Sequence, residues 1–220
     1  MADWDGDSPQ LRLNIANVLA SARADAENRV VPKVSTAKAW HKEMMAGLTV
    51  PNSIYVGRFR GERGLGKCAV RIGNVFGVAP QEVGAELQAF ETRLQEVVAG
   101  LDAQYPTDED LDEDGMLAVI DLAAWAHSEW VRIHPLANGN GRTARVWANF
   151  ILMRYGLPPA VQLRPRPGGG YGSAGASAMR GDWKPTALVF RALVRDATSA
   201  TARAAATAFL ARKTKPSRRT

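Results

Sequence analysis

Two apolar helical patterns, separated by a short segment rich in glycine and asparagine, constrain the fold of this chain more than any other feature. The first pattern repeats apolar side chains every three or four residues, at Met116, Val119, Ile120, Ala123, His127 and Trp130. The second occupies residues 142–155 and places Val146, Phe150 and Met153 on one face. This spacing is typical of amphipathic helices. The sequence therefore predicts a helix–loop–helix whose loop spans residues 134–141.

Further segments carry apolar residues at helical spacing, near residues 11–22, 87–97 and 183–212. Ser35 predicts the N-cap of another short helix. Gly100 predicts the end of the helix near residues 87–97, and Asp182 predicts the N-cap of the helix near residues 183–212. We therefore expect an all-α fold, in which a helical bundle surrounds the central helix–loop–helix.

One region departs from helical periodicity. Residues 56–78 contain six glycines among short alternating segments. Residues 57–60 and 68–72 predict the two strands of a small β-hairpin, joined by a glycine-rich turn. A second glycine-rich stretch, residues 164–175, predicts a flexible surface loop. The alternative is that Arg164 and Arg166 border the base of a bound nucleotide.

The composition indicates one globular domain with a sizeable core, because 220 residues are available and 46% of them are hydrophobic. No apolar run approaches the roughly 20 residues that cross a bilayer. Residues 1–10 lack the basic start and apolar stretch of a secretory signal. The single cysteine, Cys68, excludes an internal disulfide. We expect a cytoplasmic location without a membrane partner, with delivery into a host cell as the alternative.

The net charge of +6 is concentrated at the C-terminus, since five positive charges fall in the last nine residues and the rest of the chain stays near +1. Residues 213–220 are therefore expected to form a basic, disordered tail. A nucleic-acid partner is not expected, because binding of that kind needs a basic face on the folded body.

The segment between the two central helices carries the residues with the most chemical potential. Gly139, Asn140 and Gly141 precede a helix, where backbone N–H groups and the positive end of the helix dipole favour anions. Arg142 and Arg145 follow within the first turns. His134, at the other end of the loop, titrates near neutral pH and so suits a general base. Asn138 offers an amide oxygen to a metal ion. Together these groups suit phosphoryl or nucleotidyl transfer.

The string from His134 to Arg145 resembles the signature of the Fic family, His-x-Phe-x-Asp/Glu-Gly-Asn-Gly-Arg-x-x-Arg. The resemblance extends over residues 55–194. It includes the glycine-rich residues 57–80, Tyr171, and the segment Gly181-Asp-Trp-Lys-Pro185 that resembles the entry to the family's closing helix. It implies the Fic fold, with residues 1–54 as an N-terminal helical extension and residues 55–212 as the catalytic domain. It also implies transfer of AMP from ATP, with Mg²⁺, to a Ser, Thr or Tyr hydroxyl of a target protein.

The resemblance assigns a role to each matching position. His134 would be the general base, and Asn138 would stand where the family has its metal-binding acid. Gly139, Asn140 and Gly141 would hold the α- and β-phosphates, with Arg142 on the β- and γ-phosphates and Arg145 supporting them. The hairpin would be the family's flap, which aligns the target as an added strand. Its expected target-binding residues are Arg58, Phe59, Arg60, Cys68, Ala69 and Val70.

Two positions depart from the signature. Leu136 replaces the usual Phe and should anchor the loop more loosely. Asn138 replaces the usual acid, so we expect weaker Mg²⁺ binding or reliance on phosphate oxygens and water.

Alternatives to AMP transfer remain open at this point. The family's death-on-curing branch transfers the γ-phosphate, but its motif lacks the glycines that are intact here as Gly139 and Gly141. A second alternative is transfer of another nucleotide or phosphodiester. A third is a nucleotide-binding protein with weak catalytic activity. Family inhibitory helices carry Ser/Thr-x-x-x-Glu-Gly/Asn. Here Arg23 stands four residues before Glu27-Asn28, so we expect no internal inhibitor and a toxin controlled by a separate antitoxin chain.

Several other residues have expected structural roles. His127 is predicted to be a core or loop-bracing histidine, and His41 a surface or packing residue. Cys68 is predicted to pack and not to act as a nucleophile. Three tryptophans are expected in the core, at positions Trp125, Trp130 and Trp147.

Overall fold

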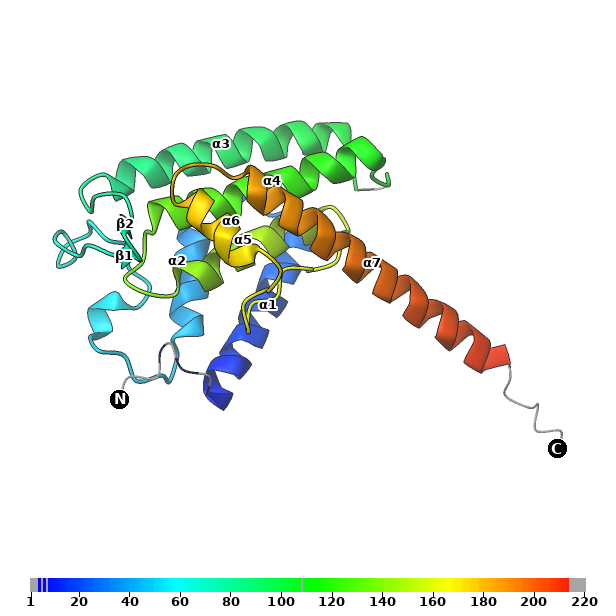
Figure 1. The fold of residues 1–220 in the computed structure, drawn as a ribbon, viewed down its shortest axis with the longest axis horizontal. Coiled ribbons are helices and arrows are strands. Elements are labelled where there is room, and N and C mark those ends of the chain that lie inside the picture. Colours follow the sequence, from blue (N-terminus) through cyan, green and yellow to red (C-terminus); the bar gives the residue numbers. More distant parts are fainter. Residues whose placement is uncertain (1–3, 5, 7, 108, 214–220) are drawn as a thin grey trace.

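The computed structural model describes residues 4, 6, 8–107 and 109–213, and it confirms the predicted all-α fold with a small hairpin (Figure 1). The helices are α1 (Pro9–Glu27), α2 (Val34–Met44), α3 (Val83–Gln104), α4 (Glu113–Ile133), α5 (Asn140–Arg154), α6 (Tyr171–Ala178) and α7 (Lys184–Lys213), with a 3₁₀ turn at Ser53–Tyr55. Strands β1 (Arg71–Ile72) and β2 (Val75–Phe76) form an antiparallel pair.

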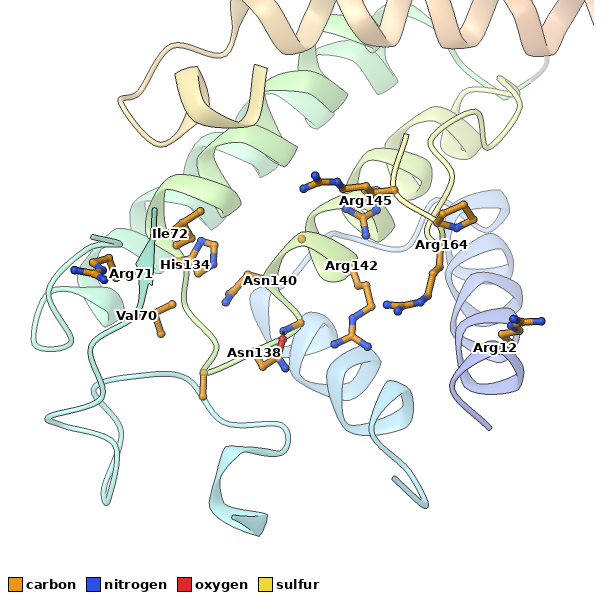
Figure 2. Close-up of a pocket in the computed structure, with 15 residues that line it drawn as sticks. Arg12, Val70, Arg71, Ile72, His134, Asn138, Asn140, Arg142, Arg145 and Arg164 are labelled. Carbon is orange, nitrogen blue, oxygen red and sulfur yellow. Dashed lines mark hydrogen bonds between the residues drawn. The ribbon is translucent and has the colours of Figure 1, made fainter. Parts of the chain in front are cut away.

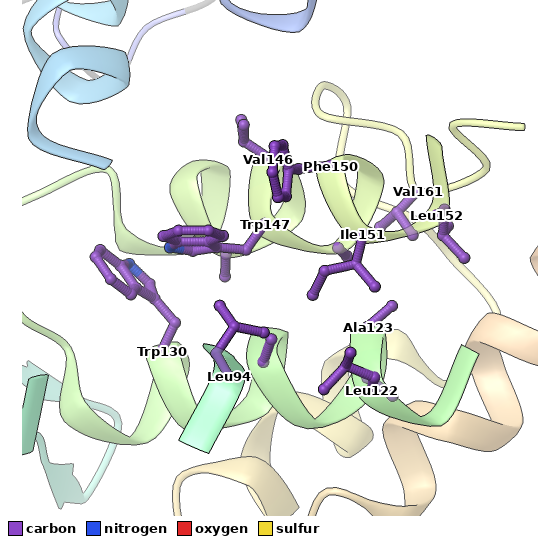
Figure 3. Packing of buried hydrophobic residues seen from close by; sticks show 14 of the residues in the cluster. Leu94, Leu122, Ala123, Trp130, Val146, Trp147, Phe150, Ile151, Leu152 and Val161 are labelled. Atoms are coloured by element: carbon purple, nitrogen blue, oxygen red, sulfur yellow. The ribbon is translucent and has the colours of Figure 1, made fainter. Parts of the chain in front are cut away.

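Helix α5 is the centre of the bundle. All but one of its residues are buried, because α4 and α1 pack along it and α2 also contacts it. Helices α3, α6 and α7 in turn pack on α4. Figure 3 shows side chains of α5 meeting those of α4, with Trp147 and Trp130 at one end of the seam. Their rings lie 5.9 Å apart between centroids, and Phe90 of α3 packs edge-on to both. The predicted helix–loop–helix is therefore the core of the fold.

The tryptophans meet the expectation of core positions, with a difference in degree. Trp130 and Trp147 are fully buried. Trp125 is only partly buried and stacks on Phe90, with ring centroids 5.5 Å apart.

Three predicted helix boundaries are wrong. Ser35 lies inside α2, which begins one residue earlier because the Glu91 carboxylate of α3 accepts the hydrogen bond from the Val34 N–H. Gly100 lies inside α3, which continues so that Leu101 can be buried; that burial offsets the roughly 1 kcal/mol cost of a helical glycine. The predicted loop 164–175 is partly helical, since α6 starts at Tyr171, whose side chain is buried. Asp182 does accept a hydrogen bond from the Lys184 N–H at the start of α7.

The hairpin is present, but the predicted pairing of residues 57–60 with residues 68–72 is wrong. Arg71 pairs with Phe76 and Ile72 with Val75 across a two-residue turn in which Gly73 has a φ of 57°. Phe59 instead forms an isolated bridge with Leu136 of the α4–α5 loop. The reason is burial, because Phe59 packs edge-on against Trp130 and so draws its segment into the core.

The predicted division at residue 54 stays a prediction. Residues of α1 and α2 share one hydrophobic cluster with the rest of the bundle. Figure 1 shows the C-terminal half of α7 extending away from that bundle. Apart from Lys213, the predicted tail lies outside the described residues. In the described part of the chain, no helix combines the length and the apolar character needed to span a membrane.

Candidate functional site

The α4–α5 loop is held in one shape by its own side chains. The Asn140 side chain accepts a hydrogen bond from the Leu136 N–H (2.8 Å) and donates one to the Leu136 carbonyl (2.7 Å). Leu136 is itself fully buried, so a leucine does anchor this loop where the resemblance led us to expect Phe. Gly139 caps α5 with a φ of 81°, a left-handed conformation that favours glycine. The loop therefore presents the N-terminus of α5 in a fixed position.

A pocket of about 1100 Å³ lies over this loop. It brings together the predicted residues His134, Asn138, Gly139, Asn140, Gly141, Arg142 and Arg145. Residues from other elements complete its wall, namely Arg12 of α1, Val70, Arg71 and Ile72 at the hairpin, and residues 164–166 (Figure 2). Six of its lining residues are arginines, and no described residue that lines it is Asp or Glu. The pocket is thus suited to an anion of high charge.

His134 is prepared to accept a proton. Its Nδ1 lies 2.8 Å from the Val131 carbonyl, which only accepts, so Nδ1 carries the hydrogen and Nε2 keeps its lone pair. Burial lowers the pKa of His134 below its ordinary value, and the Arg60 charge adds to this against the opposing hydrogen bond to Val131. The imidazole is therefore neutral at pH 7. Its backbone is left-handed, with a φ of 52°, at the end of α4.

Arg60 fixes the backbone of that histidine. The side chain is 1% exposed and donates to the His134 carbonyl through Nε (2.6 Å) and to the Ile133 carbonyl through Nη2 (2.8 Å). The same guanidinium reaches the carbonyls of Cys68 and Val78. Arg60 was expected at a target-binding surface, and the structure places it in the interior as a clamp between the hairpin segment and α4.

His41 holds the loop from the opposite side. It is fully buried; its Nδ1 accepts from the Gly57 N–H (2.9 Å), so Nε2 carries the hydrogen and donates to the Asn138 carbonyl (3.1 Å). Burial lowers the pKa of His41 to about 4, and the Arg142 charge contributes. The predicted packing role is confirmed, but the loop contact was not foreseen. Both partners are backbone atoms distant in sequence, which leave no signal in the side-chain pattern.

The two signature arginines have different surroundings. Arg142 is buried beside the pocket and donates to the Trp4 carbonyl (2.9 Å). Arg145 donates to the Leu163 carbonyl through Nε and Nη2, at 3.2 and 2.8 Å, and to the Tyr171 hydroxyl through Nη1 (3.1 Å). Most of its donors are thus committed to the protein itself.

The Tyr171 hydroxyl continues this network to α4. It lies 2.7 Å from Nε2 of His127, to which it donates because Arg145 donates to it. Burial, then the charge of Arg145, lowers the pKa of His127 to about 3. The predicted bracing role of His127 is confirmed, since it is buried and supports the residue that contacts Arg145.

The predicted flap residues are dispersed. Arg58 and Ala69 are exposed, Cys68 and Val70 are partly buried, and Phe59 is buried like Arg60. Of the six residues, only Val70 lines the pocket. The missed residues Arg71 and Ile72 form the wall there instead. The two-residue turn Gly73-Asn74 between Ile72 and Val75 is the signal that could have found them.

The lining offers poor ligands for a metal ion. The Asn138 amide oxygen already accepts a hydrogen bond from the Gly139 N–H. Within residues 4, 6, 8–107 and 109–213, no cluster of three or more His, Cys, Asp or Glu could hold a metal. Mg²⁺ prefers several oxygen ligands with carboxylates among them, so the described residues do not fit a resident Mg²⁺.

Comparison with known proteins points in one direction. A model of the Fic/DOC family matches residues 32–152. Over 46 residues, 21% of this chain and 11% of the relative, the sequence is 52% identical to the protein adenylyltransferase Fic of Nematostella vectensis. Over 53 residues, 23% of this chain and 10% of the relative, it is 45% identical to the protein adenylyltransferase fic-1 of Caenorhabditis elegans. The matched segment thus spans about a tenth of each relative.

Solved structures with similar folds cover most of the chain. A Fic domain containing signaling protein from Bacteroides thetaiotaomicron has a TM-score of 0.58 at 23% identity, over 86% of this chain and 69% of that one. The BepC protein of Bartonella tribocorum, which carries bound AMPPNP, has a TM-score of 0.57 at 15% identity, over 88% of this chain and 90% of that one. At these identities the likeness concerns the fold.

Proposed function

Since the chain belongs to the Fic/DOC family, whose model matches more than half of it, we propose that it is a protein adenylyltransferase that moves AMP from ATP onto a Ser, Thr or Tyr hydroxyl of a target protein. One observation carries the proposal, namely that the neutral His134 and the anion-binding start of α5 face a single pocket. Relatives named protein adenylyltransferase support it, although they match over short segments. The AMPPNP in the Bartonella neighbour supports an adenine nucleotide as donor.

In this reaction Nε2 of His134 takes the proton of the acceptor hydroxyl. The hydroxyl oxygen then forms a bond to the α-phosphorus, while the bond from that phosphorus to the bridging oxygen breaks and pyrophosphate leaves. The backbone N–H groups at the start of α5 and the Arg142 guanidinium stabilise the charge that develops on the phosphate oxygens. No step is assigned to Mg²⁺, because the described residues do not fit it.

The experiment that tests this function uses ATP labelled at the α- or the γ-phosphorus, with the purified chain and a bacterial lysate. We expect a protein band labelled only from the α-position and absent with His134→Ala. Label from the γ-position alone would show phosphate transfer and refute AMP transfer. If ATP gives no label, the assay is repeated with other α-labelled nucleoside triphosphates; label from one of these only would keep the enzyme class but change the donor.

We further propose control by a separate inhibitor chain. Glu27, the carboxylate in the position closest to an internal inhibitory motif, pairs with Arg23 and lines another cavity with Arg29 and Tyr105. It does not line the pocket of His134. We expect Glu27→Gly to leave the rate of α-label transfer within about twofold of the unmodified chain. A large gain in rate on this substitution would instead reveal an internal inhibitor.

A further inference from the structure

We propose that this pocket binds the phosphate chain of its donor with arginine side chains in place of a divalent cation, and that Arg164 is the ligand of the distal phosphates. The inference rests on the proposed function, because it concerns the same nucleotide donor. It deepens that function by giving the donor's form, a nucleoside triphosphate free of metal.

The first argument is the charge of the lining. A bound cation serves such a site by neutralising phosphate oxygens, usually beside a carboxylate that holds it. The described lining has no carboxylate but six arginines. A metal cation placed among these arginines is repelled by their charges, whereas the same charges attract the phosphate oxygens without a metal. Guanidinium groups also match phosphate geometry with two parallel hydrogen bonds.

The second argument is the direction of the donor. The α-phosphorus must lie beside His134, whose Nε2 activates the attacking hydroxyl. Figure 2 shows His134 on one side of the pocket, and Arg142 and Arg164 converging on the other side, with Asn138 and Asn140 between. The β- and γ-phosphates therefore extend toward these two arginines, which come from α5 and from the segment after it.

The third argument is the fixed position of Arg164. The preceding residue, Leu163, is 5% exposed and its carbonyl accepts both hydrogen bonds from Arg145. Arg145 therefore uses two hydrogen-bond donors to hold the backbone next to Arg164, and it acts as a positioning residue. Arg164 is half-buried at the pocket, in a position to present its guanidinium to a ligand.

The experiment is calorimetric titration of the full chain with two probes, ATP and inorganic tripolyphosphate, each in excess Mg²⁺ and in EDTA. We expect both probes to bind in EDTA at least as tightly as in Mg²⁺. We expect Arg164→Gln to weaken both probes by roughly tenfold or more, as loss of a charge-assisted hydrogen bond does. The affinity for AMP should stay within about twofold. The matched control is Arg180→Gln, at an exposed arginine outside the pocket.

Each outcome separates this inference from the proposed function. If both probes bind only with Mg²⁺, the inference is wrong while AMP transfer can stand. If tripolyphosphate binds in EDTA while ATP binds in neither buffer, the inference about the phosphate chain stands and ATP is refuted as the donor. An equal loss of AMP and ATP on Arg164→Gln refutes the distal role of Arg164. Thermal unfolding of the variant verifies that it is folded.

Discussion

His41 and Arg60 show how single side chains outside the signature decide the shape of the site. One holds the Asn138 carbonyl and the other the His134 carbonyl, so the two ends of the reactive loop are fixed from opposite directions. Both groups are buried, and both use their hydrogen bonds on backbone atoms. Neither side chain lines the pocket itself; each acts through a backbone carbonyl of a residue that does, and both are therefore positioning residues.

Replacing His41 tests which of its two contacts the loop needs. In His41→Gln the side-chain amide can still donate to the Asn138 carbonyl, whereas in His41→Asn the shorter amide keeps only the acceptor for the Gly57 N–H. We expect the kcat of the Gln variant to stay within about tenfold of the unmodified chain and that of the Asn variant to fall by roughly a hundredfold, because small displacements of reacting groups are costly. Single-turnover labelling measures this. Equal losses in the two variants would contradict a specific role for the Asn138 contact.

Restoring an acid at position 138 should make ATP binding depend on Mg²⁺. Asn138→Asp keeps one oxygen for the Gly139 N–H and provides a second, charged oxygen for a cation. We expect the ATP affinity of this variant to fall by roughly tenfold in EDTA and to recover with Mg²⁺, because the added charge repels phosphate until a cation offsets it. Calorimetry in the two buffers measures the ratio. A variant whose affinity is the same in both would contradict the electrostatic account.

At the scale of elements, the sequence pattern predicted what depends on side-chain periodicity and missed what depends on distant backbone contacts. The apolar repeats of α4 and α5 are long, so both helices and the loop between them could be predicted, along with the residues that the loop carries. The hairpin strands are two residues each, too short for a pattern, and Phe59 pairs with Leu136 instead. Arg12 and Arg164 reach the pocket only through tertiary packing.

The seam between the hairpin segment and α4 carries a prediction. A Cβ at Gly77 would lie 2.7 Å from the Cβ of His134 and 3.1 Å from Arg60 Nη2. We expect Gly77→Ala to cost about 1–3 kcal/mol of unfolding free energy as overpacking and to lower the labelling rate by tenfold or more, by displacing His134. Urea unfolding and α-label transfer measure the two effects.

Gly84→Ala is the matched control for this substitution, since a Cβ there meets nothing within 4 Å inside α3. We expect it to be neutral or slightly stabilising. An unchanged labelling rate in Gly77→Ala would show that the seam tolerates a methyl group without moving His134.

At the scale of the whole molecule, two buried neutral histidines make stability depend on pH. His41 and His127 have folded-state pKa values of about 4 and about 3, below the ordinary value of 6.5. Between the folded-state pKa of each histidine and pH 6.5, the unfolded chain binds a proton at that histidine and the folded chain does not. The contribution of the two histidines to the unfolding free energy is therefore fully present above pH 6.5 and is lost as the pH falls.

We therefore expect the unfolding free energy to fall from pH 6.5 toward pH 4, by up to about 1.4 kcal/mol per pH unit for each histidine. Urea titrations at half-unit steps measure the slope. His41→Gln should make the slope smaller, and His127 and His134, whose pKa values are also lowered, contribute to the slope that remains. A slope that this substitution leaves unchanged would assign the effect to other groups.

Because α5 is buried on nearly every side, some parts of the pocket tolerate substitution and others do not. The reactive loop inherits its geometry from the core, so a substitution that reshapes the loop also disturbs the packing of α1, α2 and α4. Two other walls of the pocket belong to the hairpin and to the segment after α5, neither of which is among the helices that pack on α5. Exchange of these two walls offers an engineer a route to changed ligand selectivity on an unaltered frame.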